Sequence, residues 1–326
     1  MESELLLETS FTYDEHVSER FPTVGVIGAG PLARMMVAPA AALGIKLQLF
    51  AQNSQESGAQ ICRHTVGDYK DLEALKEFAA QCDLITFEDQ LVPLSVVKGL
   101  ESTGVRVYPS SAAFIYSQDK EQMRERSHSP DCSITVLVAR SPHGQATSWS
   151  PTEVIQKDGI STLTIAPAQK ITEELSARAQ KMALDIANEI KVVGVMTVEM
   201  HVQGKEIYIY RVSMCPHESG QWTIDAARTS QFEQHLRAIL DLPLGDPGMT
   251  YEIAVTGNIF GGDKKDMYRP YLHLMARNPD LKFHQYMNEI EAGNTIGHVT
   301  AAGSDLKKLI DDVEHACDYM SGVIDE

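Results

Sequence analysis

A glycine-rich turn between an apolar segment and a helix is the feature that most constrains this fold. Residues 24–36 read VGVIGAGPLARMM, a short apolar strand that leads through a turn into an amphipathic helix. Further expected strands and helices alternate along the chain at 46–51, 71–82, 83–88, 93–102 and 105–110. Strands separated by helices at this spacing favour βαβ units. A parallel, Rossmann-like sheet is therefore predicted over residues 22–115.

The remainder of the chain has a pattern typical of antiparallel sheet packed against helices. Residues 132–168 combine alternating strands with turn residues. A long amphipathic helix is predicted at 172–191, where Thr172 is a favourable N-cap. Two strands, 193–202 and 206–214, helices at 231–242 and 305–320, and short strands in the last third complete the prediction. The predicted fold class is thus mixed α/β and α+β.

Charge and cysteine content exclude several classes of function. The net charge of −17 disfavours binding to nucleic acid or to acidic membrane surfaces, because phosphate groups would be repelled. The five cysteines form no CxxC pair, which favours reduced thiols over a disulfide framework or a zinc site. The sequence has neither a secretory signal nor a run near the ~20 apolar residues of a membrane span. A cytoplasmic protein is expected.

The turn at Gly28-Ala29-Gly30-Pro31-Leu32-Ala33 fits the pattern GxGxxA, which has two interpretations. In dinucleotide-binding enzymes the glycines let a pyrophosphate approach the helix N-terminus. Alternatively, they only permit a tight turn between strand and helix. Pro31 removes one backbone N–H group, and no acidic residue ends the second strand to hold a ribose. The tight turn is the favoured interpretation, and a plain NAD-binding protein is the last of the hypotheses.

Several segments together resemble the PurK family, the ATP-grasp enzymes that carboxylate aminoimidazole ribonucleotide in purine synthesis. VIGAGPLARMM is similar to the first turn of that family, and CDLITFEDQLVP (82–93) to its Thr-Tyr-Glu-Phe-Glu-Asn-Val-Pro stretch. YPSSAAFIYSQDK (108–120) resembles its Pro-Ser and Gln-Asp elements. The longest match is PHESGQWTIDAARTSQFEQHLRAILDLPLGD (216–246). The matches follow one another in order over nearly the whole chain.

The resemblance implies a division into domains and a partner. It predicts an N-terminal extension (1–21), a Rossmann-like pre-ATP-grasp domain (22–115), a truncated ATP-grasp core (116–262) and a small, β-rich C-terminal subdomain (263–326). Family enzymes are homodimers, so pairing with a second copy or with an active paralog is expected. A small-molecule ligand is also expected, with no nucleic-acid partner and no membrane association.

The chain departs from the family pattern where the ATP lid should lie. In the family, a lid subdomain between Lys120 and the strand at 132–140 supplies a glycine-rich loop and a lysine over the phosphates. Only EQMRERSHSPD (121–131) fills that interval here. Eleven residues are too few for such a subdomain, so a degenerate family member without a lid is predicted.

A second departure affects the metal site. Family members hold Mg²⁺ through two carboxylates on neighbouring strands, because this ion prefers hard oxygen ligands. Glu199 matches the first carboxylate, whereas Arg211 stands at the second position. A guanidinium repels a cation, so Glu199 and Arg211 are expected to form an ion pair instead. Glu218 is an alternative replacement ligand, and His217 lies beside it.

The substrate side departs as well. The family loop that binds the ribonucleotide phosphate is rich in cations, and it matches NEIEAGNTIGH (288–298), where Glu291 would repel a phosphate. His298 survives from that loop. His217, Trp222 and Asp225 have two open interpretations: a retained ligand site, or a structural turn with Trp222 packed beneath it and Asp225 bonded to backbone. His235 and His298 are expected to be structural.

These observations give one set of candidate residues. The catalytic candidates are Glu199, Glu218 and His217, and Glu199 is the metal candidate. The ligand-binding candidates are Gly28, Gly30, Glu88, Ser110, Arg211, Trp222, Asp225 and His298.

Three hypotheses remain open. The first is a PurK-like protein that has lost ATP-dependent carboxylation and acts as a binding or regulatory homologue. The second is an active carboxyaminoimidazole ribonucleotide synthetase, completed by a partner. The third is an enzyme of altered chemistry, whose pocket uses Arg211, Glu218 and Glu291 for a cationic or zwitterionic molecule. No cofactor is expected under the first hypothesis, and Mg²⁺-ATP is expected if the family activity survives.

Overall fold

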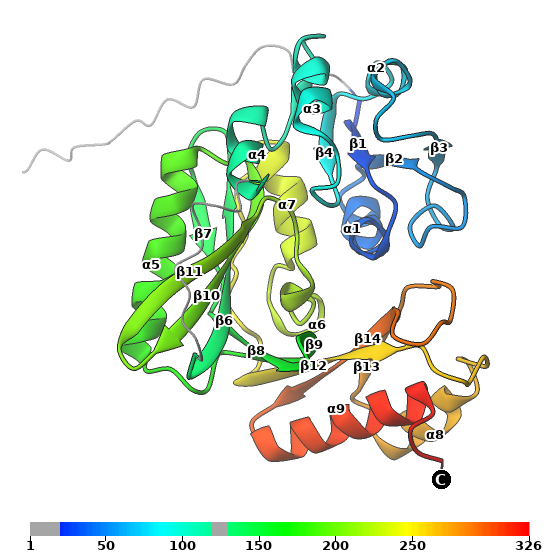
Figure 1. Ribbon diagram of the computed structural model, residues 1–326, viewed down its shortest axis with the longest axis vertical. Helices are drawn as coiled ribbons and strands as arrows, with labels where there is room; N and C mark the ends of the chain where they lie inside the picture. Colours follow the sequence, from blue (N-terminus) through cyan, green and yellow to red (C-terminus); the bar gives the residue numbers. More distant parts are fainter. Residues whose placement is uncertain (1–19, 119–129, 326) are drawn as a thin grey trace, which may run out of the picture.

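A computed structural model describes residues 20–118 and 130–325 of the chain (Figure 1). In this described part the strands form two sheets, one of five strands and one of nine. The first sheet is built from residues before 118, and the second from residues after 130. The helix α7 lies between the two sheets in Figure 1.

The first sheet is parallel, with the strand order β3-β2-β1-β4-β5. This confirms the predicted parallel, Rossmann-like sheet, and the observed helices lie between the strands as expected. Its strands are β1 (Thr23–Ile27), β2 (Lys46–Ala51), β3 (His64–Val66), β4 (Leu84–Phe87) and β5 (Arg106–Val107). Its helices are α1 (Pro31–Ala42), α2 (Leu72–Ala79), α3 (Leu94–Glu101) and α4 (Ser111–Gln118).

Apolar side chains cover both faces of this sheet. On one face, α1 packs against β1 and β2, and Phe232 and Leu236 of α7 join the same cluster. On the other face, Phe78 of α2 and Val97 of α3 pack against Phe50 of β2. The helix α7 comes after β11 of the second sheet in the chain, yet its side chains pack in the cluster of the first sheet. It therefore joins the two halves of the molecule.

The second sheet is antiparallel, with the strand order β11-β10-β6-β8-β9-β12-β14-β13, and β7 pairs with β6 beside it. Its strands are β6 (Cys132–Arg140), β7 (Ala146–Ser148), β8 (Thr152–Lys157), β9 (Ile160–Ala166), β10 (Gly194–Gln203), β11 (Glu206–Ser213), β12 (Ile253–Phe260), β13 (Lys282–Gln285) and β14 (Thr295–Gly303). The remaining helices are α5 (Glu173–Ile190), the 3₁₀ turn η1 (Glu218–Gly220), α6 (Thr223–Ala226), α7 (Gln231–Ile239), α8 (Pro270–Arg277) and α9 (Leu306–Ser321).

Helices cover opposite ends of this long sheet. The helix α5 packs on β6, β10 and β11, and α9 packs on β12 and β14 (Figure 1). Thr172 caps α5 as predicted, because its side chain accepts a hydrogen bond from the Leu175 N–H group. The strand β14 pairs with β12, so the sheet continues without a break across the predicted boundary between residues 262 and 263.

Several short elements were not predicted from the pattern, among them β3, α4, α8 and β13. Each has three to eight residues, too few for a clear periodicity. Of the segment predicted to replace the ATP lid, residues 121–129 lie outside the described residues, as does most of the N-terminal extension. No helix in the described ranges is long and apolar enough to cross a membrane.

Candidate functional site

The candidate site lies where the end of β4 meets β10, β11 and the segment that follows β11. Cys215 marks this meeting point: it is buried, which raises the pKa of its thiol to about 12, and the side chains of Glu88, Asp89, Gln90 and Arg211 all influence it. Residues from both sheets therefore face one another here.

The structure gives the glycine-rich turn an internal anion. The Glu88 carboxylate accepts hydrogen bonds from the N–H groups of Gly30, Leu32 and Ala33 at the start of α1. A Cβ atom on Gly28 or Gly30 would collide with the Glu88 side chain, so both glycines permit its close approach. Glu88 thus occupies the position where a Rossmann-type enzyme would bind a phosphate. The turn has the structural role that the sequence favoured over NAD binding.

Ser110 also has a local role. Its hydroxyl lies 3.4 Å from the N–H group of Ala113, and its carbonyl accepts from Phe114, so the residue closes the first turn of α4. The neighbouring Ser111 is held by Glu101 through both its N–H group and its hydroxyl. Ser110, which was predicted to contact a ligand, therefore lies at the start of α4 and bonds the backbone of that helix.

Glu199 and Arg211 lie opposite each other on β10 and β11 and form the ion pair that the sequence predicts. Arg211 Nε is 3.7 Å from Glu199 Oε1, and the two residues are register partners. Burial raises the pKa of the Glu199 carboxyl, and the guanidinium partly offsets this effect. Glu199 Oε1 accepts no hydrogen bond from a described residue. Arg211 is largely exposed, with 58% of its side-chain surface accessible.

His217 is held by the turn that follows β11. Its Nδ1 accepts a hydrogen bond from the Ser219 N–H group at 3.3 Å and lies 2.9 Å from the Ser219 hydroxyl. His217 Nε2 lies 3.8 Å from Glu199 Oε1. Burial and the Arg211 charge lower the pKa of His217 to about 4, so the imidazole is neutral near pH 7. Gln231 fixes the same turn by bonding the His217 N–H and carbonyl groups.

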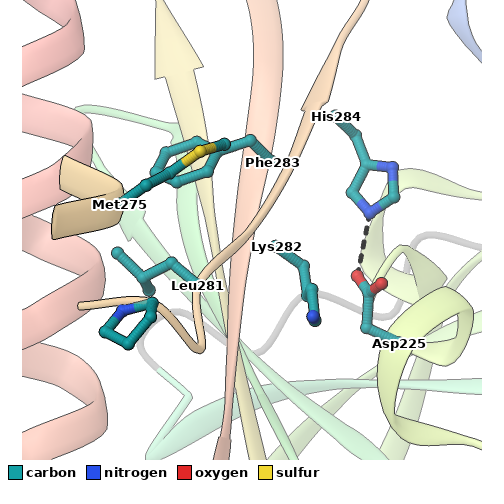
Figure 2. A pocket seen from close by; sticks show the side chains of 7 residues that line it. Asp225, Met275, Leu281, Lys282, Phe283 and His284 are labelled. Carbon is teal, nitrogen blue, oxygen red and sulfur yellow. Dashed lines mark hydrogen bonds and ion pairs between the residues drawn. The ribbon is translucent and has the colours of Figure 1, made fainter. Parts of the chain in front are cut away.

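Trp222 is fully buried, and its indole Nε1 donates to the Thr152 hydroxyl at 2.9 Å. This is the structural interpretation of Trp222 that the sequence left open. Asp225 differs from the structural interpretation, because its carboxylate bonds a side chain and not backbone: Asp225 Oδ2 is 2.9 Å from Nε2 of His284 on β13. Its role in a ligand site stays a prediction. Figure 2 shows these two side chains facing each other, with Lys282 beside them.

His298 is fully buried on β14, next to the Asp225–His284 pair. Its ring stacks on that of His284, with centroids 4.5 Å apart. Its Nδ1 lies 2.8 Å from the Tyr286 hydroxyl, which also accepts a hydrogen bond from Gln221 Nε2. His298 Nε2 and Gln221 Oε1 have no partner among the described residues. Burial and His284 lower the pKa of His298, so its ring is neutral.

Sequence reasoning missed four residues that hold this site together: Gln221, Gln231, His284 and Tyr286. The alternation of Lys282, His284 and Tyr286 was the available signal, because every second residue of a strand faces the same side. That signal is too short to separate from chance. The partners lie 14 to 65 residues apart in the chain, a separation that local patterns do not reach.

The donor set does not fit the Mg²⁺ that the family pattern implies. Arg211 places a cation where the second carboxylate would be, 3.7 Å from Glu199. Glu218 lies in η1 and not on the strand. Within residues 20–118 and 130–325, no group of three histidine, cysteine or acidic side chains is arranged to hold a metal ion. The residues at this position therefore do not fit a bound Mg²⁺ ion.

Two depressions on the described part of the molecule lie away from the residues that the third hypothesis names. One depression, of about 370 Å³, has Asp225, Lys282 and His284 on one side and Met275, Leu281 and Phe283 on the other (Figure 2). A second, of about 430 Å³, is lined by residues 249–252, 303 and 304. Neither depression includes Arg211, Glu218 or Glu291.

Comparisons with known proteins agree with this architecture. The sequence model of the ribonucleotide synthetase preATP-grasp domain matches residues 21–118, and that of the ATP-grasp domain matches residues 110–232. The N5-carboxyaminoimidazole ribonucleotide synthase of Mycobacterium tuberculosis (strain H37Rv) is 32% identical, over 92% of this chain and 88% of its own length. The chain belongs to the N5-carboxyaminoimidazole ribonucleotide synthase family. The synthase of Corynebacterium ammoniagenes is 30% identical, over 92% of each chain.

Solved structures of the synthase family share the fold. The ADP complex of the synthetase purK has a TM-score of 0.83 at 25% identity, over 92% of this chain and 98% of its own. The Aspergillus clavatus synthase in complex with ADP and aminoimidazole ribonucleotide has a TM-score of 0.82 at 23% identity, over 93% and 99% of the two chains.

The synthases are longer than this chain in their interior. The alignment with the M. tuberculosis synthase spans 377 positions, whereas 92% of this chain is only about 300 residues. Roughly 77 positions of that synthase therefore lie opposite gaps in this chain. In the structure, only residues 119–131 connect α4 to β6.

Proposed function

We propose that this chain acts at the purine-synthesis step of its family, the ATP-dependent carboxylation of aminoimidazole ribonucleotide, in an assembly that completes its ATP side. The family relationship covers 92% of the chain at 32% identity, which supports a role in the same step. The proposed assembly is a homodimer, or a heterodimer with a complete synthase. The proposed substrate side is formed by the segment after β11 together with β13 and β14.

The packing of that segment is the observation that carries the proposal. Trp222 is bonded to Thr152, Asp225 to His284, and Gln221 to Tyr286, so the segment is held against the second sheet by three separate side-chain bonds. Gln221 Oε1 and His298 Nε2 are buried without a partner among the described residues, and burying such atoms is costly unless a ligand bonds them.

The incomplete ATP side is the reason for proposing a second chain. Residues 119–131 are too few to form a subdomain, so we propose that the missing positions are the lid. Nucleotide phosphates would then be unshielded in a single chain. A second chain that covers the open edge of β11 would exclude water and supply the absent cations.

A second candidate function is a binding or regulatory homologue without catalysis. The Glu199–Arg211 ion pair favours it, because the guanidinium neutralises the carboxylate that would otherwise hold a metal. Under this proposal the chain binds ribonucleotide or a complete synthase and turns over no ATP.

One experiment separates the two candidates. Purified protein is incubated with aminoimidazole ribonucleotide, bicarbonate and Mg²⁺-ATP, and ribonucleotide-dependent ADP release is measured over a range of protein concentrations, alone and with a complete synthase. If the chain is active only in an assembly, the rate of ADP release should rise more steeply than in proportion to the protein concentration. No release beyond that of the complete synthase alone, from protein that binds the ribonucleotide by calorimetry, would contradict the first candidate and favour the second.

Variants of Arg211 extend the same experiment. Arg211→Glu places a carboxylate opposite Glu199, so this variant should bind Mg²⁺ more tightly than the wild type. Arg211→Leu is the matched control, because it removes the cation without adding a ligand. If the two variants bind Mg²⁺ equally, Arg211 does not stand at the position of a metal-binding carboxylate.

A further inference from the structure

His235 connects the two sheets through both of its ring nitrogens. The residue lies on α7 and is fully buried. Its Nδ1 accepts a hydrogen bond from the N–H group of Val195 on β10, at 3.0 Å. Its Nε2 lies 2.9 Å from the hydroxyl of Thr86 on β4. Because Nδ1 accepts, Nε2 carries the proton and donates it to Thr86.

The two bonded partners stand close to the candidate site on either side of it. Thr86 is two residues before Glu88, and the Glu88 carboxylate is bonded to α1. Asp89 and Gln90 follow Glu88 and lie beside Cys215. Val195 is four residues before Glu199 on the same strand. A side chain that holds Thr86 and Val195 at a set separation therefore also sets the distance between residues 88–90 and Glu199.

The surrounding contacts cannot set that distance alone. Phe232, Leu236 and Ile239 of α7 pack against apolar residues of the first sheet, and such contacts are not directional. His235 packs directly against the backbone of β10, since a Cβ atom on Gly194 would lie 2.8 Å from its ring. The ring therefore lies close against the strand at Gly194.

We propose that His235 is a positioning residue that sets residues 88–90 of the first sheet against the Glu199–Arg211 pair of the second. The role concerns the geometry of the site, and it holds for either candidate function. The ring acts as a rigid spacer, because the two hydrogen bonds leave opposite sides of one planar group. An apolar residue of similar size would fill the volume without fixing the register.

Hydrogen exchange on the full chain, resolved by residue, tests this role without a ligand. Thr86→Val removes the acceptor on the first sheet and keeps the volume of the side chain. The Glu88 N–H group donates to the Ile27 carbonyl, and the Leu91 N–H group donates to the Asp89 carboxylate. In Thr86→Val both amides should exchange about tenfold faster, the factor that corresponds to the loss of one buried hydrogen bond. Thr164→Val is the matched control, because its buried hydroxyl has no partner among the described residues.

Two substitutions of His235 separate its two bonds. In His235→Asn the amide oxygen can still accept from Val195 but the side chain does not reach Thr86, so only the amides of residues 88–91 should exchange faster. In His235→Gln the amide nitrogen reaches Thr86, so those amides should stay protected. A residue with only a packing role would change the exchange of all slowly exchanging amides together.

The ring itself supplies a further measurement. The ¹⁵N spectrum of the wild type should show an unprotonated Nδ1 and a protonated Nε2 in His235. The proposal is overturned if Nδ1 carries the proton. It is equally overturned if Thr86→Val and Thr164→Val give the same exchange rates at residues 88–91.

Discussion

Glu88 is a buried carboxyl group that accepts hydrogen bonds from backbone N–H groups at the start of α1. Burial raises the pKa of this carboxyl to about 7, and the bonds from Gly30, Ala33 and Leu32 partly oppose that rise. The protonated form is thus favoured in the folded state relative to the unfolded chain, where the carboxyl has an ordinary pKa. Any stability gained from this proton is present at low pH and disappears as the carboxyl ionises.

Glu88→Gln should therefore change how stability depends on pH. The contribution of Glu88 is complete below its unfolded pKa of 4.5 and is lost as pH rises through about 7. The free energy of unfolding of the wild type, relative to the neutral variant, should fall by about 3 kcal/mol between pH 4.5 and 8. Urea unfolding at a series of pH values measures it, with Glu77→Gln on an exposed helix face as the control. A constant difference across this range would show that the carboxyl is not raised.

At the scale of elements, α7 connects the two sheets, and its first turn is fixed by local sequence. Ser230 precedes the helix, and its hydroxyl accepts from the Glu233 N–H group at 3.1 Å, the Ser-x-x-Glu arrangement of a capping box. Glu233 in turn pairs with Arg237 on the next turn. The helix is short, so the loss of one terminal bond affects a large share of it.

Ser230→Ala should destabilise the protein by about 1 kcal/mol, the usual effect of losing an N-cap side chain. The reason is that the Glu233 N–H group would lose its acceptor inside the half-buried start of the helix. Chemical denaturation with an unchanged m-value measures this loss. Ser304→Ala, at an exposed position with no side-chain bond among the described residues, is the control. Equal effects of the two substitutions would mean that the cap is not formed.

At the scale of the whole molecule, buried histidines make the fold sensitive to acid. Burial lowers the pKa of His217 to about 4 and of His235 to about 3, and it also lowers that of His298. Each stays neutral in the folded state and takes up a proton readily only when unfolded. Their contribution to stability is therefore present above pH 6.5 and is lost as pH falls.

His235→Gln should make the decline of stability in acid shallower. A histidine with a pKa of about 3 when folded and 6.5 when unfolded contributes about 3 kcal/mol to the loss of stability between pH 6.5 and 4. The glutamine variant is less stable at neutral pH, and its free energy of unfolding should fall less between pH 6.5 and 4 because the histidine contribution is absent. Calorimetric unfolding across that range measures the difference, and His143→Gln in an exposed loop serves as the control. Parallel curves for wild type and His235→Gln would contradict the prediction.

Much of the fold followed from local patterns. The alternation of strands and helices predicted the parallel sheet, and turn chemistry around Thr172 predicted the start of α5, because such signals lie within a few residues of one another. The family was likewise identified from continuous segments such as 216–246. The ion pair between Glu199 and Arg211 was predicted from the resemblance, which places two metal carboxylates of the family on neighbouring strands. The turn alone would not have given the pairing, because a bulge between Glu199 and Met200 shifts the register and brings Arg211 opposite Glu199.

Only the tertiary structure decided how the site is held together. Glu88 bonds α1 across 58 residues, Asp225 meets His284 across 59, and His235 reaches Thr86 across 149. Each of these pairs depends on how a sheet and a helix pack, and packing depends on contacts between distant segments. The sequence by itself determined which elements form and which family they build. The tertiary structure assigned Glu88 to a helix start, Asp225 to a histidine and His235 to the junction of the two sheets, because side-chain partners so distant in the chain are set by packing and not by periodicity.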